Sequence, residues 1–143
     1  IGGNVFPNLG LMDVVLPDME GGLVACLSLR AWQPIDVNRT EICSWFLVEK
    51  DTPKEFKEHS YHAYMRGFGS GGAFEQDDIQ AWCEASQTAK GSMGRRLLQN
   101  VALGIANRQV DREFPGYGEA LMGNCSDTIW RDFYGTWLKY LAD

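Results

Sequence analysis

The chain has 143 residues and a mass of 16.0 kDa, which is enough for one domain with its own core. Hydrophobic residues make up 45% of the chain, a share that excludes wholesale disorder. The net charge of −6 argues against nucleic acid as a partner, and no apolar run approaches the roughly 20 residues that cross a bilayer. We therefore expect a soluble, cytoplasmic protein that binds neither nucleic acid nor membrane.

The first residues carry no initiator methionine. The chain opens with Ile1-Gly2-Gly3 and continues at once into Asn4-Val5-Phe6-Pro7-Asn8, as if it were entered in the middle of a fold. We expect it to be a piece of a longer protein.

The first half of the chain has the composition of β-structure. Residues 23–32 form an apolar-rich run, and residues 40–50 form a second run rich in β-branched and aromatic types. Between them, residues 33–39 contain Pro, Asp and Asn, which favour a turn. We expect an antiparallel hairpin here. Shorter strands are expected at residues 5–7, where a proline weakens the pattern, and at residues 13–16.

The second half has the pattern of helices. Thr52-Pro53-Lys54-Glu55 is typical of a capping box, so we expect a helix from about Pro53 to Arg66. The glycine-rich residues 69–72 separate it from a second expected helix, from Asp78 to about Lys90. Residues 91–125 contain many glycines and are expected to be loop with short elements.

The clearest predicted helix is the last, which begins near Asp127 with Ser126 or Asp127 as its cap. Its apolar residues recur at the i, i+3, i+4, i+7 spacing of an amphipathic helix. They are Ile129, Trp130, Phe133, Tyr134, Trp137, Leu138 and Leu141. The width of this stripe predicts that the helix packs lengthwise on a broad surface such as a sheet. Antiparallel strands followed by helices indicate an α+β fold.

The four cysteines give no metal-binding motif. Cys26, Cys43, Cys83 and Cys125 stand far apart, and none forms a C-x-x-C pair or lies close to a histidine. Cys26 and Cys43 lie inside apolar runs, where a free thiol behaves as a small hydrophobe. We expect buried, reduced thiols, in agreement with a cytoplasmic location.

Two adjacent carboxylates, Asp77 and Asp78, follow the glycine-rich stretch. Acidic residues at the start of a helix commonly cap free N–H groups and oppose the helix dipole. Phe68 and Phe74 bracket the glycines, however, so the carboxylates are also candidates to face an apolar space as a metal ligand or a general acid. The residue types alone leave both interpretations open.

His59 and His62 are the two histidines of the chain, and their i, i+3 spacing on a helix would let them share a metal ion. The neighbouring residues are mostly charged, including Glu55, Lys57 and Arg66. We therefore interpret both as surface histidines.

Several segments, in this order and spacing, resemble the large (alpha) subunit of Rieske-type aromatic-ring-hydroxylating dioxygenases. They are Asn4-Val5-Phe6-Pro7-Asn8, Ala31-Trp32-Gln33-Pro34-Ile35-Asp36, Val48-Glu49-Lys50-Asp51 with Thr52-Pro53 and Phe56-Lys57, residues 66–78 (RGFGSGGAFEQDD), and Phe114-Pro115-Gly116 before the aromatic helix around Trp130 to Trp137. The resemblance runs through essentially the whole chain. Its most specific part is the FEQDD stretch after the glycine-rich turn, with Trp82 four residues on.

The resemblance implies a helix-grip catalytic domain, in which an antiparallel sheet curves around a long C-terminal helix. A mononuclear non-haem Fe(II) is held in such a domain by two histidines and one carboxylate. The position of that carboxylate corresponds to Asp78, and Asp77 is then a neighbour that caps or forms a salt bridge. Phe68 and Phe74 resemble pocket-wall positions that shape the substrate cavity, and Met12 is a further candidate for its lining.

The activity implied is that of a terminal oxygenase, which adds both atoms of dioxygen to an aromatic ring to give a cis-dihydrodiol in aromatic hydrocarbon catabolism. Electrons come from NAD(P)H through a reductase, often a ferredoxin, and a [2Fe-2S] Rieske cluster. The partners implied are an aromatic substrate, dioxygen, the electron-transfer proteins, other alpha subunits and a small beta subunit.

The sequence departs from the family's pattern at the other iron ligands. His59 and His62 stand where the family has a surface helix, and no cysteine has a histidine at the spacing of Rieske ligands. The resemblance therefore covers the C-terminal part of the catalytic domain, across residues 1–143. The two iron-binding histidines and the Rieske domain would lie outside this chain, so we expect the fragment alone to be inactive.

Two other functions stay open. The chain is also compatible with a metal-free helix-grip domain that binds an apolar ligand, or with a structural piece whose Trp-rich C-terminal helix serves subunit assembly. Replacing Asp78 by Ala distinguishes the metal-free binding domain from an oxygenase. The change should abolish turnover in an intact oxygenase but barely affect the ligand affinity of a pure binding domain. Changes at Trp130 or Trp137 would alter oligomer size if assembly were the role.

Overall fold

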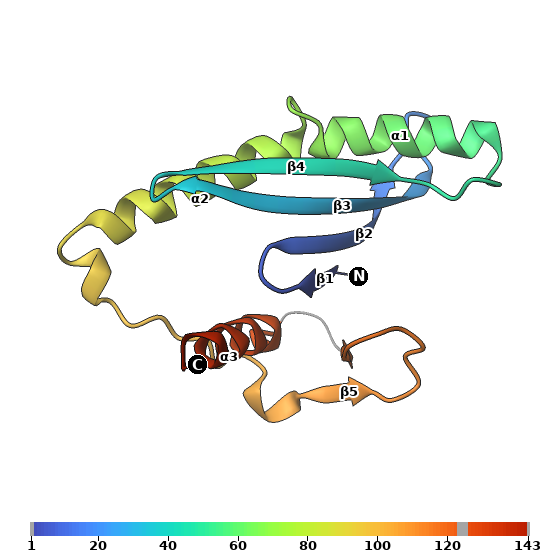
Figure 1. Cartoon of the computed structure of the whole chain (residues 1–143). Helices are drawn as coiled ribbons and strands as arrows, with labels where there is room; N and C mark the ends of the chain where they lie inside the picture. Colours follow the sequence, from blue (N-terminus) through green and yellow to red (C-terminus); the bar gives the residue numbers. More distant parts are fainter. Residues whose placement is uncertain (1, 123–125, 143) are drawn as a thin grey trace. The chain divides into compact units, whose positions relative to one another are not determined.

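The structure, a computed structural model, describes residues 2–122 and 126–142 and forms two compact units, Ile1–Arg96 and Leu97–Asp143 (Figure 1). The elements of the first unit are β1 (Gly2–Val5), β2 (Leu9–Pro17), β3 (Leu23–Asp36), β4 (Arg39–Leu47), α1 (Lys54–Phe68), α2 (Ala73–Lys90) and the short 3-10 helix η1 (Gly94–Arg96). Those of the second are the 3-10 helix η2 (Ile105–Asn107), β5 (Gln109–Asp111), β6 (Ala120–Met122) and α3 (Thr128–Ala142). Antiparallel strands with helices confirm the predicted α+β class.

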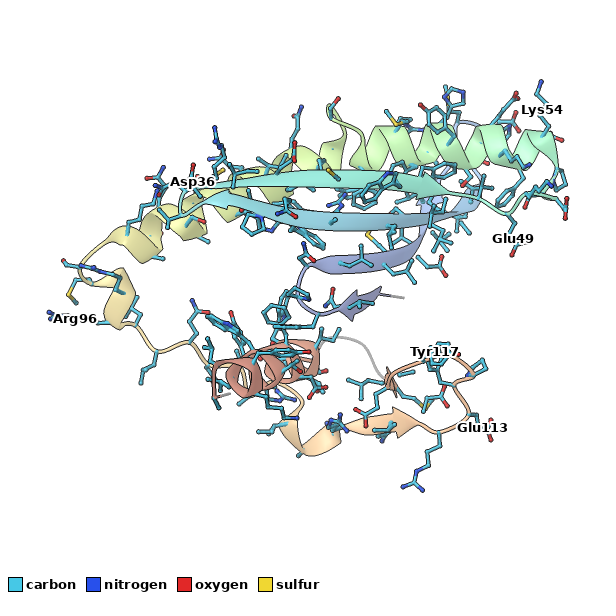
Figure 2. All side chains as sticks on the ribbon, in the orientation of Figure 1. Asp36, Glu49, Lys54, Arg96, Glu113 and Tyr117 are labelled. Carbon is cyan, nitrogen blue, oxygen red and sulfur yellow. The ribbon has the colours of Figure 1, made fainter. Side chains whose placement is uncertain are left out.

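The first unit contains a four-stranded antiparallel sheet in the order β1-β2-β3-β4. The predicted hairpin is confirmed as β3 and β4, but β3 runs four residues further than predicted, β4 ends three residues earlier, and the turn is only Val37-Asn38. The backbone N–H of Asn38 donates to the Asp36 carboxylate at 2.8 Å, which satisfies the tight turn locally. Figure 2 places Asp36 at one end of this hairpin and Glu49 and Lys54 at the other.

The short N-terminal strands differ from the prediction. Pro7 lies in the turn between β1 and β2 rather than in a strand, as its lack of an N–H donor favours. β2 is longer than expected and is hydrogen-bonded on both sides, to β1 and β3.

Helix α1 confirms the predicted helix to within two residues at either end, although its capping box does not form. The N-cap is Pro53 in extended backbone, so the helix begins one residue later than a Thr52 cap would allow. No side chain caps this end. Glu55 still lies in the first turn, where its charge complements the helix dipole.

Helix α2 begins five residues before the predicted start, at Ala73 instead of Asp78. Gly72 is its N-cap, and the first turn already makes tertiary contacts through Phe74 and Glu75. These tertiary contacts stabilise the first turn of α2, whereas the acidic residues of the local sequence alone do not predict it. Asp78 is therefore in the second turn of the helix rather than at its first position.

The core of the first unit lies between one face of the sheet and α1, which runs along it in Figure 1. Its buried members are Leu16, Val24, Cys26, Ala63 and Tyr64. Successive turns of α1 face successive inward residues of β3. The Cys26 thiol donates to the carbonyl of Ser60 at 3.4 Å, and two turns later Phe68 lies under Arg30. This alternation fixes which residues of β3 face the helices.

The second unit is mostly loop with short elements, as predicted for residues 91–125 where the structure describes them. Glu113 and Tyr117 lie on the loop that joins β5 to β6 (Figure 2). Helix α3 confirms the predicted last helix. Asp127 directly precedes it, and its carbonyl accepts from the N–H of Arg131 at 3.0 Å, as expected of an N-cap residue, while its carboxylate accepts from the backbone N–H of Leu103 at 3.0 Å. Much of the apolar stripe of α3 is exposed, including Trp130 and Leu138.

The cysteines follow the prediction in part. Cys26 is buried, and this burial raises the pKa of its thiol. Cys43 is half-buried, whereas Cys83 is exposed on α2, so the prediction of a buried thiol is wrong there. All three are free thiols, and Cys125 lies outside the described residues. In the part of the chain that the structure describes, no helix is long and apolar enough to span a membrane.

Candidate functional site

Asp78, the predicted iron ligand, is half-buried in the second turn of α2. Its carboxylate makes no hydrogen bond or ion pair with any described residue. The adjacent Asp77 is exposed and makes no polar contact with a described residue, so the prediction that it caps the helix is wrong, and the alternative that it forms a salt bridge stays a prediction. The helix begins at Ala73 and the N–H of Gln76 already bonds to Gly72, which leaves Asp77 just past the free N–H groups.

The acidic residue that makes a tertiary contact in this stretch is Glu75. Its Oε2 atom accepts from a guanidinium nitrogen of Arg30 at 2.7 Å, and each side chain is only 9% exposed. The guanidinium of Arg30 also lies 5.7 Å from the centre of the Phe68 ring. We did not predict this pair. The available signal was a single arginine inside the apolar run of residues 23–32, because a buried charge requires a partner.

Two of the three predicted pocket residues lie together. The rings of Phe68 and Phe74 are 5.5 Å apart across the glycine-rich turn, and Tyr64 extends the group at 5.9 Å from Phe68. Phe74 is one helical turn before Asp78. Met12 is half-buried on β2 opposite Ser28, on the sheet face that also carries Arg30. The structure thus groups the two phenylalanines near Asp78 and places Met12 on the neighbouring sheet face.

Asp78 is suited to be one ligand of a metal ion. A half-buried carboxylate that contacts no polar group of residues 2–122 and 126–142 is available as a hard oxygen donor of the kind that Fe(II) accepts. Among the described residues, no group of three or more His, Cys, Asp and Glu side chains is arranged to hold a metal. Asp78 could therefore supply one ligand of a metal site only together with ligands from outside the described residues.

The histidines make different contacts. His59 lies between two carboxylates, with Nδ1 3.8 Å from Asp18 and Nε2 3.9 Å from Glu20. It is half-buried rather than a free surface residue. His62 is exposed, as predicted, beside the ring of Tyr61 at 5.8 Å.

An open depression of about 460 Å³ lies beside His59, between the β2–β3 loop and the start of α1. It is lined by Asp18, Glu20, Leu23, Val24, Pro53, Glu55, Phe56 and His59. Asp18 is held by the backbone N–H groups of Gly22 and Glu20, and the bond from Gly22 is the main cause that lowers the pKa of its carboxyl. None of the predicted site residues lines this depression.

Similarities to known proteins support the family resemblance. The alpha subunit of biphenyl 2,3-dioxygenase from Rhodococcus jostii is 32% identical over 115 residues, which cover 80% of this chain and 25% of that subunit. The alpha subunit of N,N-dimethyl phenylurea N-demethylase from a Sphingobium strain is 26% identical over 142 residues, or 99% of this chain and 31% of that subunit. No known protein-family model matches the chain.

A solved structure agrees with these relatives. Naphthalene 1,2-dioxygenase from Rhodococcus sp., bound to indole, matches with a TM-score of 0.84 and 34% sequence identity, over 96% of this chain and 32% of that one. The chain thus spans between a quarter and a third of the proteins it matches. The sequence-based recognition is confirmed: this chain is a homologue of the alpha subunits of ring-hydroxylating dioxygenases.

Proposed function

We propose that this chain is the C-terminal part of the mononuclear-iron catalytic domain of a terminal oxygenase alpha subunit, which dihydroxylates an aromatic ring. The proposal is supported by Asp78, a half-buried carboxylate that has no hydrogen bond or ion pair with a described residue and whose place in the sequence resembles that of the family's carboxylate ligand. It stands one turn after Phe74 in a chain similar over most of its length to dioxygenase alpha subunits.

Asp78 and two histidines outside this chain would hold the Fe(II). When bound, the iron supplies the site at which dioxygen is reductively activated. The part of Asp78 is to provide one anionic oxygen ligand from a rigid helix, which leaves other positions of the metal open. A [2Fe-2S] Rieske cluster in a preceding domain, and NAD(P)H through a reductase or ferredoxin, are the proposed source of electrons.

The aromatic side chains of this chain would receive the substrate. Phe68 and Phe74 form an apolar surface next to the turn that carries Asp78, and Met12 adds an apolar side chain on the facing sheet. Such walls orient an aromatic ring by shape and exclude water from the reacting centre. The relative named for an N-demethylase indicates that this framework accepts more than one kind of substrate, so the ring itself is part of the proposal.

The remaining features of the protein follow from the same proposal. The isolated chain is inactive, because a single carboxylate ligand does not fix the geometry of an iron ion. The intact protein works in the cytoplasm with other alpha subunits, a small beta subunit and the electron-transfer proteins. Names of the relatives as subunits support partner proteins in general.

The proposal is tested in the intact protein with Asp78→Ala and, as a matched control, Asp77→Ala. Product formation from naphthalene and from biphenyl is measured with a reductant and an electron-transfer system, together with the affinity for each hydrocarbon. We expect Asp78→Ala to abolish product formation while Asp77→Ala retains it. Unchanged hydrocarbon affinity with no oxygenation in any form of the protein, the unsubstituted one included, would instead show a metal-free binding domain.

A further inference from the structure

Within this chain, helix α2 contacts the sheet through the Arg30–Glu75 pair and contacts α1 through Phe74. Of its residues 73–90, all described by the structure, only Glu75 is buried, and no side chain caps the N-terminus. The neighbouring Phe74 is about half exposed and contacts Phe68 on one side. Among the described residues, Glu75 is thus the one side chain of α2 that is both buried and bound to the sheet.

Arg30, the partner of Glu75, is held in place by the sheet and by α1. Arg30 lies on β3, which is hydrogen-bonded to β2 on one side and to β4 on the other. Its guanidinium is confined further by the ring of Phe68, at the C-terminal end of α1. Since Arg30 is only 7% exposed, its position is determined by the sheet and by α1 rather than by solvent.

Asp78 follows Glu75 by three residues, which is less than one turn of the helix and about 4.5 Å along its axis. Residues at this spacing share one side of a helix. No described residue makes a hydrogen bond or ion pair with the Asp78 carboxylate, so its position is inherited from the backbone of α2. A displacement of Glu75 would move Asp78 with it.

We propose that the Arg30–Glu75 ion pair is a positioning device that sets the carboxylate of Asp78 for metal binding; this inference rests on the proposed function. A buried ion pair is a poor way to gain stability, since apolar residues of similar volume often do as well. It is an effective way to specify geometry, because an unpaired charge excludes alternative rotations of the helix. Arg30 and Glu75 act through Asp78 and do not themselves bind metal.

The test uses the metal-free intact protein titrated with Fe²⁺ under nitrogen. The readouts are the affinity for Fe²⁺ and the electron paramagnetic resonance spectrum of the Fe²⁺ complex with nitric oxide. The variants are Glu75→Gln, which leaves Arg30 unpaired, and the double variant Arg30→Met/Glu75→Met, which removes both charges. Glu58→Gln is the matched control, because Glu58 pairs with Lys54 at 3.4 Å on the exposed side of α1. Asp78→Ala is the reference.

We expect Glu75→Gln to weaken Fe²⁺ binding about 10–100-fold, as outer positioning groups of metal sites do. We expect the double variant to recover the thermal midpoint of the unsubstituted protein but not its affinity or spectrum, while Glu58→Gln changes neither. This combination separates position from stability, and it remains informative if Glu75→Gln fails to fold.

Normal Fe²⁺ affinity and a normal spectrum in the double variant would overturn the inference and leave the pair with a structural role alone. The proposed function is judged by the reference variant. If Asp78→Ala binds Fe²⁺ as the unsubstituted protein does, the proposed function fails and this inference fails with it. Loss of binding in Asp78→Ala together with normal binding in the double variant overturns only the inference.

Discussion

Two arginines of this chain pair with glutamates through the same chemistry in different surroundings. Arg30 and Glu75 are each 9% exposed, at a 2.7 Å contact between β3 and α2. Arg108 pairs with Glu119 and lies 3.4 Å from Asp132 in the second unit, and these side chains are between 38% and 55% exposed. The hydrogen bond that Arg108 donates to Glu119 raises the pKa of its guanidinium, so Arg108 stays charged throughout the ordinary pH range.

The difference in burial decides what each pair does. Water and salt screen the exposed pair, so its loss has little effect on the fold. Water cannot replace a lost partner of the buried pair, so that pair must be complete. An ion pair in this protein therefore affects the fold strongly only where burial prevents water from replacing a lost partner. The same reasoning extends to buried groups that are not charged.

The largest effect is expected from Glu75→Gln, which leaves the Arg30 guanidinium buried without its counter-charge. Breaking a buried pair in this way costs about 3–5 kcal/mol. Hydrogen exchange of residues 73–90 in the intact protein measures this cost as a faster local opening of α2. Glu119→Gln is the matched change at the exposed pair and should leave exchange around Arg108 nearly unaltered. Equal effects of the two changes would show that burial does not decide the importance of these ion pairs.

A smaller effect is expected from Gly72→Ala at the turn that starts α2. A Cβ atom on Gly72 would lie 2.4 Å from the carbonyl oxygen of Gly67, so the backbone must shift. Overpacking of this kind costs about 1–3 kcal/mol and would loosen the turn that leads to Glu75. Gly71→Ala is the control, because nothing lies within 4 Å of its Cβ position. The thermal midpoint of the intact protein should fall for Gly72→Ala and stay unchanged for Gly71→Ala; the reverse order would contradict the structure.

Tyr64→Phe tests the effect of burial at a neutral polar group. The hydroxyl of Tyr64 is buried and has no hydrogen-bond partner among the described residues. Its removal should be neutral or stabilise the fold by up to about 1 kcal/mol, because no bond is lost and a desolvated group disappears. Tyr61→Phe is the control, since Tyr61 packs against the same Phe46 ring but is 46% exposed. Destabilisation by Tyr64→Phe beyond that of Tyr61→Phe would show that the hydroxyl has a partner after all.

The smallest effect concerns Asp18, whose pKa is lowered below 3.8 chiefly by the hydrogen bond from the Gly22 N–H. A lowered pKa in the folded state means that the ionised carboxylate stabilises the β2–β3 loop at pH values above the ordinary pKa of aspartate. This contribution is lost as the pH falls through the lowered pKa. Hydrogen exchange of residues 18–24, corrected for intrinsic rates, should therefore quicken only below pH 3.8. The change should be absent in Asp18→Asn; a loop insensitive to acid in both forms would contradict the assignment.

Much of the fold could be predicted from local patterns. Runs of β-branched residues predict the β3–β4 hairpin. The glycine-rich stretch predicts where α1 ends, and a 3.6-residue apolar period predicts α3. The start of α2 could not be predicted in this way, because the contacts that stabilise its first turn are made with Phe68 and Arg30. Glu75 is 45 residues from Arg30 in sequence, and only the topology of the sheet brings them together.

The candidate site shows the same division. On residue types alone, Asp77 and Asp78 were equally acceptable as capping residues, and only the family resemblance distinguished Asp78. The structure supplies what neither source contained: Asp77 is exposed, Asp78 is half-buried, and Glu75 is the acidic residue attached to the sheet. The three carboxylates differ in burial and in the side of the helix on which they lie. Neither property can be predicted from an acidic run before the start of the helix is known.

The role of Asp78 as an iron ligand is tested most directly by the iron content of the intact protein with Asp78→Ala beside Asp77→Ala. Both changes remove one carboxylate from the same turn of α2. The account predicts that Asp78→Ala loses the mononuclear iron and keeps any iron of a Rieske cluster, whereas Asp77→Ala retains both. Full mononuclear iron in Asp78→Ala, or its loss in Asp77→Ala alone, would contradict the account.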